Sequence, residues 1–208
     1  MSEQGTLDIL LMRHGTPAYP PEVYPDPFLM PLSSQGRLEA EHAAAAVERF
    51  CPDLIFSSDF LRASETAQLA AVNLSVKIQL VSELRERVFY SLAGESFTEI
   101  IREYGDIGKA VTEGNSDLLE LPGEEVYTES RQRVVNFIRK LALAESGHRV
   151  LAVCHGGPHA WLIEEALNVD LRGTRSVTLR TGFFSRFSVQ DGHFKLVAMN
   201  LPPIGVGA

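Results

Sequence analysis

Cysteines, basic residues and long apolar runs are scarce in this 208-residue chain, and each scarcity excludes a class of protein. Its two cysteines, Cys51 and Cys154, cannot form the disulfide framework of a small secreted domain. No apolar run reaches the length of a membrane-spanning helix, and the first residues, Met1–Gly5, are polar and unlike a secretory signal. We therefore expect a cytoplasmic protein that has no membrane partner.

Basic residues are outnumbered by acidic ones, with 19 Lys and Arg against 27 Asp and Glu and a formal net charge of −8 at pH 7. Such a chain is poorly suited to general binding of nucleic acids or of anionic membrane surfaces. It contains no internal repeat, low-complexity tract or domain linker. With 45% hydrophobic residues, we expect one domain over residues 1–208 that buries a sheet between helical layers.

The most informative segment is Met12–Gly15, which reads Met-Arg-His-Gly and directly follows the apolar run Leu7–Leu11. A short apolar run of this kind predicts a buried parallel strand, and ligands of open α/β sheets bind beyond the carboxyl ends of such strands. Arg13 can grip phosphate oxygens with its guanidinium, and His14 can attack phosphorus with its imidazole. The alternative for this segment alone is a surface turn with two solvated side chains.

A second His-Gly pair follows another apolar run, His148–Cys154. His155 and Gly156 then lie at the start of a helix that extends through Leu167, with Pro158 in its first turn. Free amides and the helix dipole favour an anion there, so we expect both residues to contact substrate. The alternative for His155 is a capping residue without chemistry. Cys154 is interpreted as a small core residue, because no phosphate-cradling loop ending in arginine follows it.

A third segment supplies another cation. The strand predicted at Asp53–Phe56 leads into a polar turn, in which Asp59 is a candidate N-cap for a helix over Phe60–Val72. Arg62 falls in the first turn of that helix, where a cation opposes the helix dipole and is better placed to bind a shared anion. The alternative is an ion pair of Arg62 with Asp59 or Glu65.

The remaining pattern alternates strands with helices, which favours a three-layer α/β/α sandwich with a mostly parallel central sheet. A C-terminal hairpin is expected around the turn Asp191-Gly192. The further elements expected are helices at Ser34–Phe50 and Arg131–Ala144, and strands at Val76–Val81, Phe183–Val189 and Phe194–Met199.

The motifs, taken together and in their order along the chain, resemble the histidine phosphatase superfamily, the phosphoglycerate-mutase-like proteins, and in particular its phosphatase branch. The likeness spans nearly the whole chain and implies the phosphoglycerate-mutase-like fold. The segments that carry it are Leu11–Gly15, Pro31–Arg37, Ser57–Ala67, Leu84–Tyr90, Pro122–Val134 and Val153–Gly157.

The resemblance assigns roles to individual residues. His14 matches the histidine that becomes phosphorylated, Arg13 and Arg62 match the phosphate-binding arginines, and His155 matches the second histidine of the pocket. Glu86 matches the proton donor. Glu83 is the rival carboxylate, although the Leu-Arg-Glu-x-x-Phe register favours Glu86.

The implied function is a phosphomonoesterase that hydrolyses a small phosphorylated metabolite through a phosphohistidine on His14. We expect no metal and no cofactor, because the arginines supply the charge neutralisation that a magnesium ion otherwise provides. Two alternatives stay open at this point. One is a cofactor-dependent mutase of the phosphoglycerate type, and the other is a non-catalytic phosphate-ligand or partner-binding module on the same fold.

Two segments are expected to govern specificity. The proline-rich loop Thr16–Pro31 starts directly after the nucleophile, so its aromatic residues can form a wall of the site; the alternative is a stiff surface loop. Residues 94–122 match the family's variable cap, and this cap is short. A short cap admits water to the phosphohistidine, which favours hydrolysis over return of the phosphoryl group.

Overall fold

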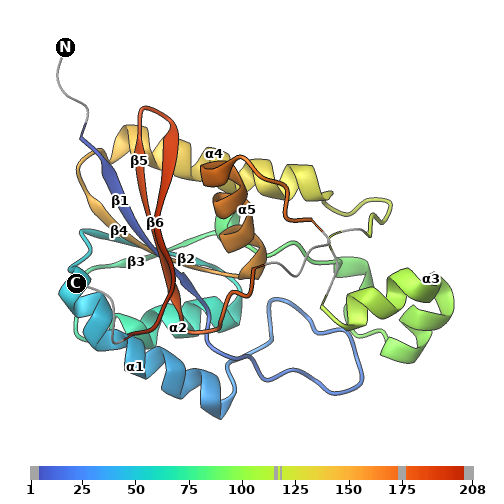
Figure 1. The fold of residues 1–208 in the computed structure, drawn as a ribbon. Helices are drawn as coiled ribbons and strands as arrows, with labels where there is room; N and C mark the ends of the chain where they lie inside the picture. The colour runs from blue at the N-terminus through green and yellow to red at the C-terminus, as the bar shows by residue number, and fades with distance from the viewer. Residues whose placement is uncertain (1–4, 115–116, 118, 173–176, 204–208) are drawn as a thin grey trace.

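Six strands run through the described part of the computed structural model, which comprises residues 5–114, 117, 119–172 and 177–203. They are β1 (Leu7–Arg13), β2 (Leu54–Ser58), β3 (Ile78–Val81), β4 (Arg149–Cys154), β5 (Phe184–Gln190) and β6 (His193–Leu201). One sheet holds them in the order β3-β2-β4-β1-β5-β6 (Figure 1). The first four strands pair in parallel, whereas β5 pairs antiparallel with both β1 and β6.

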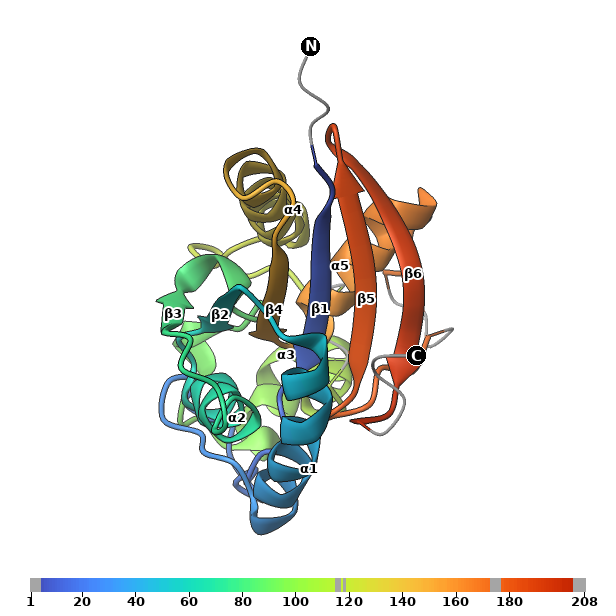
Figure 2. The same cartoon turned by 90° about the vertical axis from the view of Figure 1, so that its left-hand side faces the viewer.

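Helices cover both faces of this sheet, so the predicted three-layer α/β/α architecture is confirmed (Figure 2). On one face lie α1 (Ser34–Phe50) and α2 (Leu61–Ala70), and on the other lie α4 (Tyr127–Ala144) and α5 (Gly156–Leu167). A further helix, α3 (Phe97–Thr112), lies beyond the end of the sheet (Figure 1). Within the described residues, no helix combines the length and the apolar composition needed to cross a bilayer.

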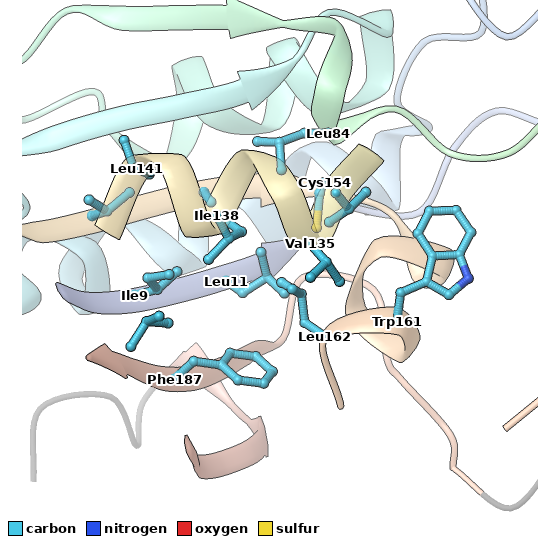
Figure 3. Close-up of a cluster of buried hydrophobic side chains, with 14 of the residues drawn as sticks. Ile9, Leu11, Leu84, Val135, Ile138, Leu141, Cys154, Trp161, Leu162 and Phe187 are labelled. Carbon is cyan, nitrogen blue, oxygen red and sulfur yellow. The ribbon is translucent and has the colours of Figure 1, made fainter. Parts of the chain in front are cut away.

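The central strands are apolar on both faces, as a sheet between two helical layers requires. Ile9 and Leu11 of β1 point towards α4 and α5, together with Cys154 at the end of β4 (Figure 3). Leu10 and Met12 point to the opposite face and pack against the alanines of α1 and α2. Cys154 is fully buried in the first of these cores, so its interpretation as a small core residue is confirmed.

Two glycines allow the chain to turn sharply after β1. A Cβ added to Gly15 would lie 2.3 Å from the carbonyl oxygen of Gly36, and one added to Gly36 would lie 2.0 Å from the carbonyl oxygen of Thr16. Neither glycine therefore has room for a side chain. The start of α1 presses against the backbone that follows His14 and fixes the direction in which the chain leaves the sheet.

Several element boundaries differ from those predicted. The N-cap of α2 is Phe60 and not Asp59, whose carboxylate forms an ion pair with Arg85 instead. Helix α4 begins at Tyr127, four residues earlier than predicted, whereas α5 carries Pro158 within its first turn and extends through Leu167, as predicted. The C-terminal hairpin is confirmed; both residues of its turn have positive φ, as a two-residue hairpin turn demands.

The proline-rich loop Thr16–Pro31 and α3 are joined at the same end of the molecule. The backbone of Tyr24 accepts a hydrogen bond from Gly94 and donates one to Glu95, and Phe97 donates to Glu22. Helix α3 is capped by the side chain of Ser96, is interrupted at Gly105 with φ of 58°, and has its own small core around Phe89 and Leu92. These contacts make the loop and α3 one continuous structure beyond the carboxyl ends of the parallel strands.

A buried histidine of α5 braces the end of β1. His159 is 1% exposed, and its Nε2 lies 3.0 Å from the carbonyl oxygen of Leu11, to which it donates a hydrogen bond. Burial lowers the pKa of His159 to about 4. In the unfolded chain a histidine titrates near 6.5, so the folded state binds fewer protons than the unfolded state between these two values. The stability contributed by a neutral His159 is complete above the unfolded value and is lost as the pH falls.

His159→Gln is therefore expected to flatten the acid side of the stability profile, because glutamine is neutral at every pH and still has a donor for Leu11. At pH 5 the cost of keeping His159 neutral is about 2 kcal/mol, at about 1.36 kcal/mol per pH unit. Urea unfolding at pH 7 and pH 5 measures this difference. The exposed His193→Gln is the control for loss of a histidine. Equal pH dependence in wild type and His159→Gln would contradict the assignment.

Candidate active site

The predicted site residues meet where the parallel strands end. Arg13 ends β1 and pairs in register with Cys154 of β4, and the backbone N–H of His14 continues this ladder by donating to the Cys154 carbonyl at 2.9 Å. His155 follows β4 directly, and Arg62 enters from the first turn of α2. Parallel pairing of neighbouring strands thus brings together residues that lie up to about 140 positions apart in the sequence.

His14 is held as a neutral imidazole with one free lone pair. It is 3% exposed, and its Nδ1 lies 2.7 Å from the carbonyl oxygen of Gly15. A carbonyl only accepts, so Nδ1 carries the proton and Nε2 does not. Burial lowers the pKa of His14 well below its usual value, and the charges of Arg62 and Arg13 lower it further. Nε2, which accepts from Arg62 Nε at 3.3 Å, is the nucleophilic atom of this arrangement.

Arg62 is almost fully buried and is positioned by backbone contacts. Its Nη1 donates to the carbonyl oxygen of Pro27 at 3.1 Å. The Thr66 hydroxyl donates to the Arg62 carbonyl at 2.7 Å and accepts from the backbone N–H of Gly15 at 3.0 Å. One threonine therefore connects α2 to the turn that carries the predicted nucleophile.

The alternative ion pairs of Arg62 do not form. Asp59 pairs with Arg85 at 2.5 Å, and Glu65 pairs with Arg37 at 3.3 Å while also accepting a hydrogen bond from the backbone of Leu32. Asp59 and Glu65 therefore do not neutralise the guanidinium of Arg62, which lines the cavity.

Arg13 enters the site from the opposite side. Its Nη1 donates to the carbonyl oxygen of Leu179, in the segment that precedes β5, and the backbone N–H of Gly182 donates to the Arg13 carbonyl at 3.1 Å. Its buried Nε has no hydrogen-bond partner among the described residues. A buried guanidinium N–H without a partner is costly, and an anion bound beside His14 would satisfy it.

His155 occupies the N-cap position of α5, but its side chain does not cap the helix. Its ring is fully buried, Nε2 lies 2.8 Å from Ser58 Oγ, and the Phe60 ring packs edge-on at 5.3 Å. Burial lowers the pKa of His155 well below its usual value, and Arg62 and His14 lower it further. The capping alternative for His155 is therefore wrong. Its ring centroid lies 5.0 Å from that of His14, which is close enough for both to contact one phosphoryl group.

Glu86 faces this group from the segment after η1 (Ser82–Leu84). Its Oε2 accepts from the backbone N–H of Gly157 at 2.9 Å, and its Oε1 accepts from that of Arg87 at 3.0 Å. Burial raises the pKa of Glu86 and outweighs the hydrogen bond from Gly157 and the charge of Arg62, which favour the ionised form. Glu86 therefore lines the same cavity as Arg13 and Arg62, and its raised pKa means that it keeps its proton to a higher pH than an ordinary glutamate does.

The two glycines after His155 have different surroundings. A Cβ added to Gly157 would lie 2.1 Å from Oε1 of Glu86, whereas one added to Gly156 would meet Arg13 Cζ at an ordinary 3.5 Å. The absence of a side chain at Gly157 thus leaves space for the carboxylate of Glu86, which accepts a hydrogen bond from the Gly157 amide. Gly156, predicted as a substrate contact, is the first residue of α5 beside the Arg13 guanidinium, where its amide can serve an anion.

The rival acid does not line the cavity, and the rival nucleophile is a buried thiol with a raised pKa. Glu83 is not among the residues that line the cavity, and its carboxylate accepts a hydrogen bond from Ser82 at 3.4 Å. Arg133, in the predicted Gly-Glu…Arg-Val segment, holds the Glu83 carbonyl at 2.7 Å and pairs with Glu125. The thiol of Cys154 is buried, and burial raises its pKa, so it is not a thiolate nucleophile.

Sequence reasoning missed three residues that support the site: Ser58, Thr66 and Gly157. Ser58 was visible only as part of a polar turn, and its fully buried hydroxyl instead contacts His155. Thr66 lies four residues after Arg62, one helical turn away, and that spacing was the available signal. Gly157 follows Gly156 in an otherwise ordinary Gly-Gly pair, which carries no mark of the close approach to Glu86.

A cavity of about 580 Å³ opens above this floor. Of the predicted site residues, Arg13, Arg62 and Glu86 line the cavity, whereas His14 and His155 do not; the proline-rich loop and α3 form its walls. The loop is therefore a wall of the site and not only a stiff surface segment. In the parts of the chain that the structure describes, no three His, Cys, Asp or Glu side chains are grouped closely enough to hold a metal ion.

Comparisons with known proteins agree with this geometry. Adenosylcobalamin/alpha-ribazole phosphatase of Escherichia coli is 24% identical over 197 residues, which cover 94% of this chain and 97% of that protein. The 2,3-bisphosphoglycerate-dependent phosphoglycerate mutase of Chlamydia muridarum is also 24% identical, over 84% of this chain and 90% of the mutase.

Solved structures share the fold. The crystal structure of a putative alpha-ribazole-5′-P phosphatase from E. coli superposes with a TM-score of 0.80 at 21% identity, covering 97% of this chain and all of that chain. The sequence model of the histidine phosphatase superfamily (branch 1) matches residues 9–202, which include every predicted site residue. The chain therefore belongs to the histidine phosphatase superfamily.

Proposed function

We propose that this protein is a phosphomonoesterase that hydrolyses a small phosphorylated metabolite through a phosphohistidine on His14. The observation that carries the proposal is the state of His14: a buried, neutral imidazole whose Nδ1 proton is committed to Gly15 and whose Nε2 lone pair lies beside Arg62. Such an atom can attack phosphorus without first losing a proton. A phosphatase among the relatives supports the same activity.

In the first step, His14 Nε2 forms a bond to phosphorus as the bond to the ester oxygen breaks. Arg13 and Arg62 offset the charge that develops on the phosphoryl oxygens. In this proposal the Ser58 hydroxyl donates to His155 Nε2 at 2.8 Å, so that the proton of His155 is on Nδ1 and is donated to a further phosphoryl oxygen. Glu86, whose raised pKa favours its acid form, gives its proton to the leaving oxygen.

In the second step, the carboxylate of Glu86 accepts a proton from water, and the water oxygen forms a bond to phosphorus as the bond to His14 Nε2 breaks. Inorganic phosphate leaves, and both residues return to their starting states. The hydrogen bonds from Gly157 and Arg87 to Glu86 keep the carboxylate in one place for both proton transfers. No charge in this cycle requires a metal ion, since the two arginines and the donors around them match the phosphoryl oxygens.

The chain acts, in this proposal, as a single catalytic domain with a short cap between residues 94 and 122. A cavity of about 580 Å³ between this cap and the loop gives water access to Arg62, which contacts His14. Hydrolysis is therefore favoured over phosphoryl return, although a mutase is also among the relatives. The intact set of nucleophile, acid and cations argues against a non-catalytic module.

His14→Ala is expected to lower kcat by roughly 10⁴-fold or more while the protein remains folded, because the nucleophile acts as one unit with its neighbours. An acid-labile, base-stable phosphoryl group should be trapped on wild type and be absent from the variant. The exposed His42→Ala is the control for loss of a histidine. All assays contain EDTA; loss of activity that magnesium or zinc restores would contradict the metal-independent mechanism, and turnover by folded His14→Ala would contradict the nucleophile.

Glu86→Gln is expected to lower kcat for alkyl phosphates by ~10²–10⁴-fold and to affect p-nitrophenyl phosphate far less, because nitrophenolate leaves without a proton. In wild type, kcat for alkyl phosphates should fall as the pH rises past the raised pKa of Glu86, where the acid form disappears. Interconversion of 3- and 2-phosphoglycerate, primed by 2,3-bisphosphoglycerate and faster than phosphate release, would identify a mutase instead.

Gly157→Ala and Gly156→Ala form a matched pair. The methyl group at position 157 would lie 2.1 Å from Oε1 of Glu86 and 2.9 Å from Cζ2 of the buried Trp161, so we expect a loss of stability together with a loss of ~10²-fold in kcat for alkyl phosphates. The methyl group at position 156 meets Arg13 at an ordinary distance and leaves the amide in place, so kcat should change only a few-fold. Equal effects of the two variants in steady-state assays would contradict the positioning of Glu86 by Gly157.

A further inference from the structure

The outer part of the cavity differs in chemistry from its floor. Beyond Arg13, Arg62 and Glu86, most of the lining residues have aromatic or aliphatic side chains. Tyr19 and Tyr24 come from the proline-rich loop, and Phe97 and Val111 come from the two ends of α3. An apolar wall of this kind binds by excluding water from apolar surface and contributes little to the binding of a charge.

The cations that line the cavity are already committed. Arg13 and Arg62 belong to the phosphoryl floor, as described above. The third, Arg87, is 4% exposed and donates to the carbonyl oxygens of Glu125, at 2.8 Å, and Leu119, while its guanidinium lies over the ring of Phe89. Among the described lining residues there is thus no further Lys, Arg or His that faces the outer cavity.

The remaining ionisable groups of the wall add no positive charge. Glu113 lines the cavity at the end of α3, and the phenols of Tyr19 and Tyr24 are neutral groups that can donate or accept a hydrogen bond. A substrate carboxylate placed here would lose hydration, and among the described lining residues the only cations are Arg13, Arg62 and Arg87, whose contacts are given above; such a carboxylate is costly in a partly buried site. The backbone carbonyls at the C-terminal end of α3 add negative potential on the same side.

The size of the cavity also exceeds what a small phosphorylated acid needs. Its volume of about 580 Å³ lies inside the range of ~300–1,000 Å³ typical of pockets that enclose drug-sized ligands. The wall is built as one piece, because the backbone of Tyr24 is hydrogen-bonded to Gly94 and Glu95 and its hydroxyl accepts from Phe89 at 3.2 Å. The leaving group therefore meets a preformed surface.

On the basis of the proposed function, we infer that the leaving alcohol of the substrate is bulky, uncharged and largely apolar or aromatic, and that short phosphorylated acids are disfavoured. Tyr19, Phe97 and Val111 select this alcohol, while Arg13 and Arg62 hold the phosphoryl group. The class comprises phosphate monoesters of aryl-substituted or long aliphatic alcohols, in contrast to those of hydroxy acids.

Three alkyl phosphates with primary alcohols as leaving groups test the inference: 4-phenylbutyl phosphate, ethyl phosphate and 3-phosphoglycerate. We expect kcat/KM to be at least ~100-fold higher for 4-phenylbutyl phosphate than for 3-phosphoglycerate, since even one methylene in an apolar pocket changes it by ~10–200-fold. Ethyl phosphate reports the phosphoryl chemistry alone. Equal or higher kcat/KM for 3-phosphoglycerate would overturn the inference.

Substitutions in the wall should change this preference. Tyr19→Ala and Phe97→Ala are each expected to lower the ratio of kcat/KM for 4-phenylbutyl phosphate over ethyl phosphate by ~10-fold. Leu29→Ala, at an exposed position of the same loop and outside the lining, is the matched control and should leave the ratio unchanged. A ratio that Tyr19→Ala and Phe97→Ala do not alter would overturn the assigned wall.

Adding a cation to the wall tests whether the lack of a further positive charge among the described lining residues disfavours phosphorylated acids. Thr112→Arg adds a cation to the lining at the last residue of α3, where the helix dipole favours it, and should raise kcat/KM for 3-phosphoglycerate relative to ethyl phosphate by ~10-fold. Thr112→Gln, of similar shape but neutral, is the control and should give no increase. An equal increase in both variants would contradict the electrostatic argument.

Binding separates this inference from the proposed function. Hydrolysis of ethyl phosphate and p-nitrophenyl phosphate reports the phosphatase, and its absence would overturn the proposed function alone. Calorimetric titration with 4-phenylbutylphosphonate and 3-phosphonopropionate then measures the affinity of the wall for each group in the absence of turnover. We expect the phenylbutyl compound to bind at least ~10-fold more tightly; equal affinity, or tighter binding of the phosphonopropionate, would overturn the inference.

Discussion

An imidazole has one N–H to donate and one lone pair to offer, and in His14 the N–H goes to the carbonyl oxygen of Gly15. That contact depends on the turn that follows β1. The amide of Gly15 is held by Thr66 of α2, and its Cα lies against Gly36 of α1. Three segments distant in sequence therefore fix one peptide unit, and this peptide unit determines which nitrogen of His14 carries the proton and which does not. The site depends first on this backbone geometry.

Burial is the common cause of the electrostatics around that nitrogen. It lowers the pKa values of His14 and His155 and raises that of Glu86, so each group is shifted towards its neutral form. The charges that remain belong to Arg13 and Arg62, which guanidinium chemistry keeps protonated. A site of neutral titratable groups and permanent cations has a net positive charge before any ligand arrives, inside a protein whose overall charge is negative.

The sequence predicted the elements of the sheet well, because apolar runs that end at glycine and proline have few other interpretations. The predicted strand at residues 7–11 and the helix at Ser34–Phe50 correspond to observed elements, and the layer arrangement follows from their alternation. Helix starts were less predictable. Asp59 is a good N-cap by type, but its ion pair with Arg85, 26 residues away, was invisible in a local pattern.

The same distinction applies to the site. The gathering of Arg13, His14, Arg62 and His155 follows from parallel strand ends and was predictable, as was the acid at Glu86 from the resemblance. The contacts that hold these side chains in position were not predictable. Ser58 contacts His155, and Gly157 leaves space for the carboxylate of Glu86. Both contacts join residues that are far apart in the sequence, so a local sequence pattern does not indicate them. Their roles in catalysis remain proposals.

The division of labour between the sheet and the segments beyond it has an evolutionary consequence. The floor of the cavity comes from strand ends and helix starts whose backbones are fixed by the core, whereas the wall comes from the proline-rich loop and α3, whose backbones pair with each other. Insertions or substitutions in these two segments can alter the wall with little strain on the floor. We therefore expect proteins with the same floor to differ mainly in the residues of the wall. Differences in the molecules that such proteins bind should then correspond to differences in the wall.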